Sequence, residues 1–221
     1  MTINRAAEHR FGKQFYDRHY RNRRTRVVTP AEMARRAELI AAFVRHGELR
    51  VRRILDAGCG LGLMREPLLE RLPGARYTGL EASPYLCEQY GWEQGSLANW
   101  THNRPFDLVV CYDVLQYLDA RDAAAAIRGL GRLCSGVLHF GALTLEDWRE
   151  YCDRRLTDRA VHLRSANWYL SRLRPGFVNA GSGMFVRRSA PLHLWALEQL
   201  RPPRTRRGRE TKSGRATGRR R

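Results

Sequence analysis

The chain has 221 residues, 43% of them hydrophobic, a size that suits one domain with appendages. It has no run of about 18 apolar residues, and its first 15 residues lack an apolar core, so we expect neither a membrane-spanning helix nor a secretory signal. The net charge of +18 is concentrated at the ends: residues 1–53 carry 14 basic and 5 acidic side chains, residues 201–221 carry 10 and 1, and the part between them is neutral.

The N-terminal arm, residues 1–29, is polar and aromatic around the sequence FYDRHYRNRRTR, which predicts an ordered arm or a short amphipathic helix. A longer helix should follow, because Thr29 is a good N-cap and Pro30 suits the first helical position. We expect Gly47 to end it. One face of this helix carries the apolar residues Met33, Ala37, Ile40 and Val44.

From Val51 the apolar pattern alternates between strands and helices. The predicted strands are residues 52–57, 75–82, about 92–96, 106–115 and 135–143, and the predicted helices are residues 63–72, 83–90, 119–133, 145–156 and 165–173. The nearly continuous apolar run FDLVVCYDVL is typical of a central parallel strand buried on both faces.

The end of the predicted domain has a different pattern. Residues 176–189, GFVNAGSGMFVRRS, read as two short strands joined at Gly181–Gly183. The sequence therefore predicts an α/β fold: a doubly wound, mostly parallel seven-stranded sheet that ends in an antiparallel hairpin. An amphipathic segment, residues 191–200, should pack on its end, which gives a domain over residues 30–200. Residues 201–221 have no aliphatic or aromatic side chain larger than alanine, so we expect a disordered Arg-rich tail.

The five cysteines are odd in number, far apart and never spaced as C-x-x-C. That pattern argues against a zinc ribbon or thioredoxin-like chemistry. Three of them, Cys87, Cys111 and Cys134, fall in apolar patterns and read as small core residues. We expect a reduced, cytoplasmic protein.

The glycine-rich stretch ILDAGCGLGLM, residues 54–64, follows a strand, as nucleotide-binding turns do. The dinucleotide pattern G-x-G-x-x-G would require glycine at Leu63, but the third glycine is Gly62. Asp56, at the mouth of the loop, would repel a pyrophosphate and suits a ligand with an ammonium or sulfonium group. No G-K-[ST] follows, which excludes a P-loop.

The pattern D-x-G-x-G-x-G at residues 56–62 resembles the first motif of the class I S-adenosylmethionine-dependent methyltransferases. The resemblance extends to Glu81, placed where that family binds the ribose hydroxyls, and to FDLVVCYDVLQYL, which is similar to its fourth strand and following loop. Ser96 stands where the family often has an acidic residue near the adenine. The cofactor-binding residues that the resemblance implies for S-adenosylmethionine are Asp56, Gly58, Cys59, Gly60, Gly62, Glu81, Ala82, Ser96, Leu97, Asp113 and Val114.

A sulfonium methyl group is already activated, so positioning and exclusion of water should supply most of the rate, and no catalytic residue can be named. On the acceptor side we expect Tyr16, His19 and Tyr20 of the arm to act as a lid, together with Gln116 and Tyr117. Trp148, Tyr151 and Asp153 are further candidates. Each of these also has a purely structural interpretation as a packing residue. His139, inside a predicted strand, reads as a buried structural imidazole.

Three functions stay open at this point. The first is a methyltransferase for a small-molecule acceptor, the second is one that acts on RNA or protein recruited by the basic ends, and the third is a non-catalytic S-adenosylmethionine-binding protein. Two nucleic-acid reactions are disfavoured, because the chain has neither an [N/D/S]-P-P-[Y/F/W] motif after the fourth strand nor any Pro-Cys pair. The tail has no aromatic residue to stack on bases, so nucleic-acid binding is possible but not favoured. Neither the acceptor nor the oligomeric state follows from the sequence.

Overall fold

The computed structural model describes residues 10–200 of the chain. Its centre is a seven-stranded sheet with the order β3-β2-β1-β4-β5-β7-β6. Strands β1 to β5 pair in parallel, and β7 pairs antiparallel with both β5 and β6. The strands are β1 Arg53–Ala57, β2 Arg76–Glu81, β3 Glu93–Gln94, β4 Phe106–Tyr112, β5 Cys134–Gly141, β6 Phe177–Gly181 and β7 Met184–Arg187. This architecture confirms the predicted doubly wound sheet with its terminal hairpin.

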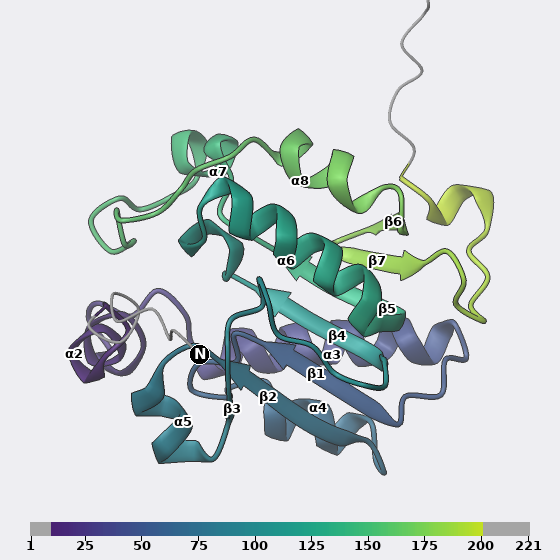
Figure 1. Cartoon of the computed structure of the whole chain (residues 1–221), viewed down its shortest axis with the longest axis horizontal. Helices are drawn as coiled ribbons and strands as arrows, with labels where there is room; N and C mark the ends of the chain where they lie inside the picture. The colour runs from purple at the N-terminus through teal and green to yellow at the C-terminus, as the bar shows by residue number, and fades with distance from the viewer. Residues whose placement is uncertain (1–9, 201–221) are drawn as a thin grey trace, which may run out of the picture.

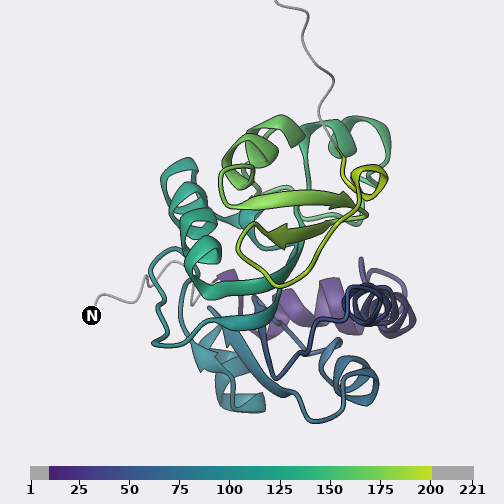
Figure 2. The ribbon, with the colours of Figure 1, turned by 90° about the vertical axis from the view of Figure 1, so that its right-hand side faces the viewer.

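Helices cover both faces of the sheet (Figures 1 and 2). On one face lie α3 (Pro30–His46) and α4 (Arg65–Arg71), and on the other lie α6 (Ala120–Leu133) and α8 (Ala166–Leu173). Helices α5 (Pro84–Tyr90) and α7 (Leu145–Glu150) are short. Among the described residues, none of the helices has the length and apolar character needed to cross a membrane.

The central strands send alternate side chains into two apolar clusters. On β1, Ile54 packs on the α3 side and Leu55 on the α6 side, both fully buried. The same alternation on β4 places Leu108 and Val109 on opposite faces. A strand buried on both sides is apolar at most positions, which is why residues 108–111 of FDLVVCYDVL are all apolar and buried.

Side-chain caps begin the helices where the sequence predicted. Thr29 Oγ1 accepts a hydrogen bond from Glu32 N at 3.1 Å, and Asp119 Oδ1 accepts one from Asp122 N at 2.8 Å. Ser83 and Ser165 cap α5 and α8 in the same way. Each cap supplies an acceptor to an N–H group that has no partner within the helix.

The structure corrects two of the predicted elements. Strand β3 has two residues rather than about five, because it pairs only with the last two residues of β2. Helix α7 ends at Glu150 instead of residue 156, since the Asp153 carboxylate accepts a hydrogen bond from Arg155 N and starts a separate turn. Residues 191–200 pack on the core through Leu192 and Leu194, as predicted for an amphipathic segment, whereas Trp195 and Leu197 are exposed. The tail prediction lies outside the described residues.

Candidate active site

The glycine loop after β1 brings three strand ends together. Gly58, Gly60 and Gly62 all have positive φ angles, of 78°, 53° and 69°. Gly58 N donates to Leu80 O at 2.7 Å, which ties the loop to β2. A Cβ atom on Gly58 would lie 2.3 Å from Val114 Cγ2 beyond β4. Glycine is therefore required here by both conformation and space.

Glu81, the last residue of β2, is 6% exposed and organises this loop. Its carboxylate accepts hydrogen bonds from Gly60 N at 2.9 Å, Ala82 N at 2.8 Å and Ser83 N at 2.9 Å. Burial raises the pKa of Glu81, and these backbone N–H groups oppose that shift. The carboxylate thus holds the glycine loop against the end of β2.

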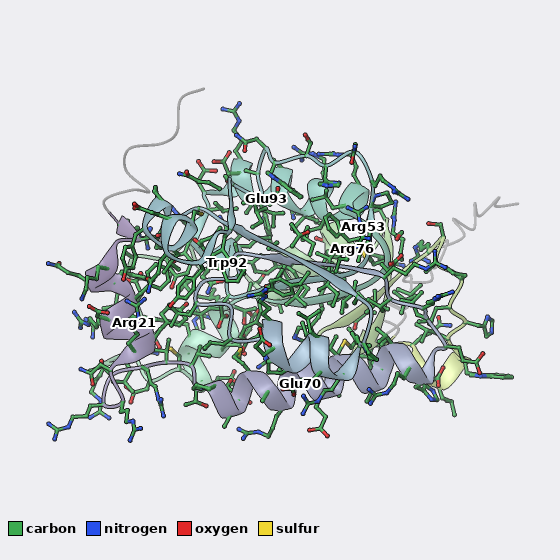
Figure 3. The ribbon with its side chains drawn as sticks, turned by 90° about the horizontal axis from the view of Figure 1, so that it is seen from below. Arg21, Arg53, Glu70, Arg76, Trp92 and Glu93 are labelled. Carbon is green, nitrogen blue, oxygen red and sulfur yellow. The ribbon has the colours of Figure 1, made fainter. Side chains whose placement is uncertain are left out.

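The N-terminal arm lies across the carboxyl end of the sheet. Its first turns are α2 (Lys13–Tyr16) and the π-helical η1 (Asp17–Arg21). Arg21 donates to Tyr85 Oη at 2.9 Å and to Gln89 Oε1 at 3.0 Å, both on α5. Seen from below, Arg21 lies at the opposite end of the molecule from Arg53, the first residue of β1 (Figure 3).

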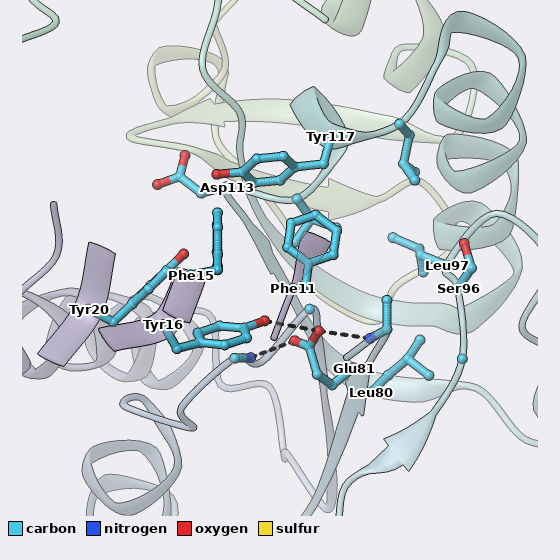
Figure 4. A pocket seen from close by; sticks show the side chains of 16 residues that line it. Phe11, Phe15, Tyr16, Tyr20, Leu80, Glu81, Ser96, Leu97, Asp113 and Tyr117 are labelled. Carbon is cyan, nitrogen blue, oxygen red and sulfur yellow. Dashed lines mark hydrogen bonds between the residues drawn. The ribbon is translucent and has the colours of Figure 1, made fainter. Parts of the chain in front are cut away.

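The arm and the strand ends enclose a small space of about 90 Å³, which we call the inner cavity (Figure 4). Eight of the predicted cofactor residues line it: Gly58, Gly60, Glu81, Ala82, Ser96, Leu97, Asp113 and Val114. Four aromatic side chains of the arm line it as well: Phe11, Phe15, Tyr16 and Tyr20.

A second and larger space, about 850 Å³, opens beside the carboxyl ends of β4 and β5, and we call it the outer cavity. Of the predicted acceptor-side residues, His19, Tyr20, Gln116 and Tyr117 line it, as do Tyr151 and Asp153. His139 of β5 is 1% exposed and also lies in its wall. The volume falls in the range of roughly 300–1,000 Å³ that small-molecule sites occupy.

Three residues border both cavities: Tyr20, Asp113 and Tyr117. Asp113 follows β4 directly and has a φ of 58°, which an aspartate adopts rarely. Burial raises the pKa of Asp113 to about 6, with the Arg36 charge and a hydrogen bond from Gln116 opposing the rise. Strain of this kind gathers at functional sites, where the surrounding fold holds it in place.

Four predicted residues lie outside both cavities. Cys59, Gly62 and Trp148 line neither of them, and Gly62 instead leaves room for the Trp92 ring, 2.6 Å from where its Cβ would be. Asp56 is 5% exposed and accepts a hydrogen bond from Tyr77 Oη at 2.5 Å. Its carboxylate therefore faces a tyrosine within the fold rather than the inner cavity.

Two groups of lining residues were missed by sequence reasoning. Phe11 and Phe15 stand four residues apart in the arm, a spacing that indicates one helical face but not what that face covers. Arg36 and Tyr112 meet across 76 positions of sequence, and nothing in the charged pattern of α3 distinguishes Arg36 from its neighbours.

A family model described as a methyltransferase domain matches residues 55–158. Over 107 residues the chain is 32% identical to a trans-aconitate 2-methyltransferase of Pseudomonas paraeruginosa, a match that covers 44% of this chain and 37% of that protein. Residues 55–158 form a class I methyltransferase domain. The chain is also 31% identical over 116 residues to a malonyl-[acyl-carrier protein] O-methyltransferase of Magnetococcus marinus, a match that covers 45% of this chain and 42% of the relative. It spans less than half the length of these curated relatives.

Solved structures of class I methyltransferases share the fold. A sugar N-methyltransferase from Streptoalloteichus superposes with a TM-score of 0.59 at 20% identity, over 78% of this chain and 91% of that one. A magnesium protoporphyrin IX methyltransferase from Synechocystis, solved with S-adenosylhomocysteine, superposes with a TM-score of 0.57 at 19% identity, over 83% and 96% of the two chains. At such identities the likeness extends to the fold alone.

Proposed function

We propose that this chain transfers a methyl group from S-adenosylmethionine to a small-molecule acceptor. The observation that carries the proposal is the pair of adjoining cavities at the carboxyl ends of the strands, with Asp113 on the border between them. Ligands of doubly wound sheets bind at this edge. The inner cavity would hold the methyl donor and the outer cavity the acceptor.

The residues that line the inner cavity have the chemical character that the cofactor requires. Glu81 offers a buried carboxylate to the two ribose hydroxyls, Gly58 and Gly60 let a ligand approach the backbone, and Leu97 offers an apolar surface to the adenine. The size of the cavity supports the further idea that the arm moves. Small-molecule sites have volumes of roughly 300 Å³ or more, and the inner cavity, at about 90 Å³, is well below that volume. Phe11, Phe15 and Tyr16 must therefore shift to admit the cofactor.

When bound, S-adenosylmethionine supplies an electrophilic methyl group. The acceptor atom then needs an accessible lone pair in line with that group, and the aromatic arm would exclude water from both reactants. Asp113 is the best-placed carboxylate to accept a proton from an acceptor O–H or N–H group, because it borders both cavities and has a pKa of about 6.

The trans-aconitate methyltransferase among the relatives supports an acceptor of low molecular weight, since trans-aconitate is a small molecule. The alternative of an RNA or protein acceptor draws its support from the basic ends of the chain. Removal of residues 201–221 tests this alternative. If the shortened chain no longer associates with RNA but still binds the cofactor, the tail binds RNA and is not needed for the cofactor site. A cytoplasmic location stays a prediction.

Calorimetry with S-adenosylhomocysteine tests the cofactor assignment. Glu81→Gln should weaken binding by about 1.5–3 kcal/mol, the contribution of a hydrogen bond to a charged group. Glu93→Gln is the matched control. Glu93 is the first residue of the neighbouring strand β3, but it is exposed and lines neither cavity. Thermal stabilisation by NAD but by neither sulfur ligand would contradict the proposal.

A further inference from the structure

The outer cavity has a wall of buried polar atoms without partners. Four buried side-chain nitrogen or oxygen atoms have no hydrogen-bond partner among residues 10–200: His19 Nδ1, Arg36 Nε, Gln116 Oε1 and His139 Nδ1. All four belong to residues that line the outer cavity. Unpaired buried polar atoms are rare in folded proteins, because each loses its bonds to water without replacement. Their concentration around one cavity points to a polar ligand.

Arg36 stands out among them because it is the one arginine or lysine that lines this cavity in the described part of the chain. Its guanidinium carbon lies 3.8 Å from the centre of the Tyr112 ring, and its Nη2 donates to Tyr112 Oη at 2.9 Å. The side chain is 23% exposed. The stacked ring and the hydrogen bond orient the guanidinium before any ligand arrives.

His139 adds a second donor beside Arg36. Arg36 Nη1 lies 3.4 Å from His139 Nε2, so this nitrogen is the acceptor and the ring proton is on the unpaired Nδ1. Burial, assisted by the Arg36 charge, lowers the pKa of His139 to about 3. The imidazole is therefore neutral at physiological pH and offers an N–H group.

Two acidic residues around the cavity interact with Arg36: Glu32 forms an ion pair with it, and the buried Asp113 feels its charge, but neither accepts a hydrogen bond from it. Asp158 pairs with Arg10 at 3.2 Å, and Asp153 pairs with Arg155 at 3.3 Å. Glu32 Oε1 is 3.6 Å from Arg36 Nη2, which is too long for a hydrogen bond, and its side chain is 37% exposed. The charge of Arg36 is thus only partly compensated, and its Nε–H remains unpaired.

We propose that the acceptor carries a carboxylate, and that Arg36 binds this carboxylate with His139 as a second donor in the wall of the outer cavity. The inference rests on the proposed function and specifies its substrate class. A guanidinium binds a carboxylate through two parallel N–H···O bonds, a geometry that the Nε–H and a terminal N–H provide. A neutral acceptor would leave the charge of Arg36 only partly compensated.

The test uses the full chain saturated with S-adenosylhomocysteine and a panel of probes. The probes are trans-aconitate, succinate and glutarate, each with its uncharged amide, and glucosamine as a cationic alternative. We expect at least one carboxylate to bind at least tenfold more tightly than its amide and than glucosamine. Arg36→Gln should weaken that binding about 10- to 100-fold, and Arg36→Lys should weaken it less.

Arg35→Gln is the matched control, since Arg35 is the neighbouring exposed residue of the same helix and the change in charge is identical. It should leave carboxylate binding unchanged. The inference is overturned when no carboxylate binds, when an amide or glucosamine binds as well, or when the two glutamine variants behave alike. Binding of S-adenosylhomocysteine to the wild-type chain separates the two proposals. If the chain does not bind S-adenosylhomocysteine, the proposed function is contradicted. If it binds S-adenosylhomocysteine but no carboxylate, only this inference is contradicted. A thermal melt of each variant shows that it is folded.

Discussion

The hydroxyl of Tyr16 lies 3.4 Å from Oε1 of Glu81, so the arm contacts the very carboxylate that is proposed to hold the cofactor ribose (Figure 4). Burial and the nearby Glu81 charge raise the pKa of Tyr16, which keeps the phenol protonated and able to donate. The arm is also tied down at Phe11, whose carbonyl oxygen accepts from Ser83 Oγ at 2.5 Å. If Glu81 binds the ribose as proposed, Tyr16 takes the place of a ribose hydroxyl, and cofactor binding would displace it.

The first prediction concerns this competition. Tyr16→Phe removes the competing hydroxyl and keeps the aromatic packing of the arm, so we expect S-adenosylhomocysteine to bind about two- to tenfold more tightly. Calorimetry measures the change, and Tyr151→Phe, at an 81% exposed position, should have no effect. Weaker binding by Tyr16→Phe would instead mean that the hydroxyl contacts the bound cofactor.

The second prediction separates backbone strain from steric overlap in the glycine loop. Gly58 and Gly74 both have positive φ angles, of 78° and 82°, but a Cβ on Gly74 meets nothing within 4 Å. Gly74→Ala should lower the free energy of unfolding by about 1 kcal/mol, and Gly58→Ala by about 2–4 kcal/mol, because the latter also overlaps Val114. Urea denaturation measures both. Adding Val114→Ala should recover part of the Gly58→Ala loss, and no recovery would argue against that contact.

The third prediction concerns the buried Asp56. Desolvation raises its pKa to about 6, above its ordinary value of 3.8, although the Tyr77 hydrogen bond opposes the shift. The folded state then binds the proton more tightly than the unfolded state, so Asp56 destabilises the protein above pH 6 and ceases to do so as the pH falls toward 4. Asp56→Asn should raise the free energy of unfolding by up to about 3 kcal/mol at pH 8 and change it little at pH 4. Equal effects at the two pH values in urea titrations would refute the burial argument.

The fourth prediction concerns Asp113 as a proton acceptor. If the reacting atom of the acceptor carries a proton, only the ionised carboxylate can take it, so kcat should rise with pH through about 6 and level off above pH 7. Asp113→Asn should lower kcat by about 10²- to 10⁴-fold and abolish this pH dependence. Rates measured with a labelled methyl donor from pH 5 to 8 check both effects. A variant with the wild-type profile would remove Asp113 from proton transfer.

The order of the strands and helices could be predicted from the sequence because each element carries its own signal. The caps at Thr29, Ser83 and Asp119 and the apolar run of β4 are local features, readable without any neighbour. The glycine loop and Glu81 follow the same logic, since a parallel sheet brings the ends of β1 and β2 to one edge. Where predicted elements failed, as at β3 and α7, the extent depended on pairing or on a turn that the pattern does not encode.

The sequence by itself determined the fold class, the family resemblance and the position of the glycine loop, all of which depend on periodicity and spacing along the chain. Only the tertiary structure decided that Asp56 faces Tyr77, that the rings of the arm line the inner cavity, and that Arg36 meets Tyr112 and His139 beside the outer one. The physical reason is that these contacts join residues far apart in sequence, and their identity depends on which side chains remain unpaired after the sheet and its helices have packed.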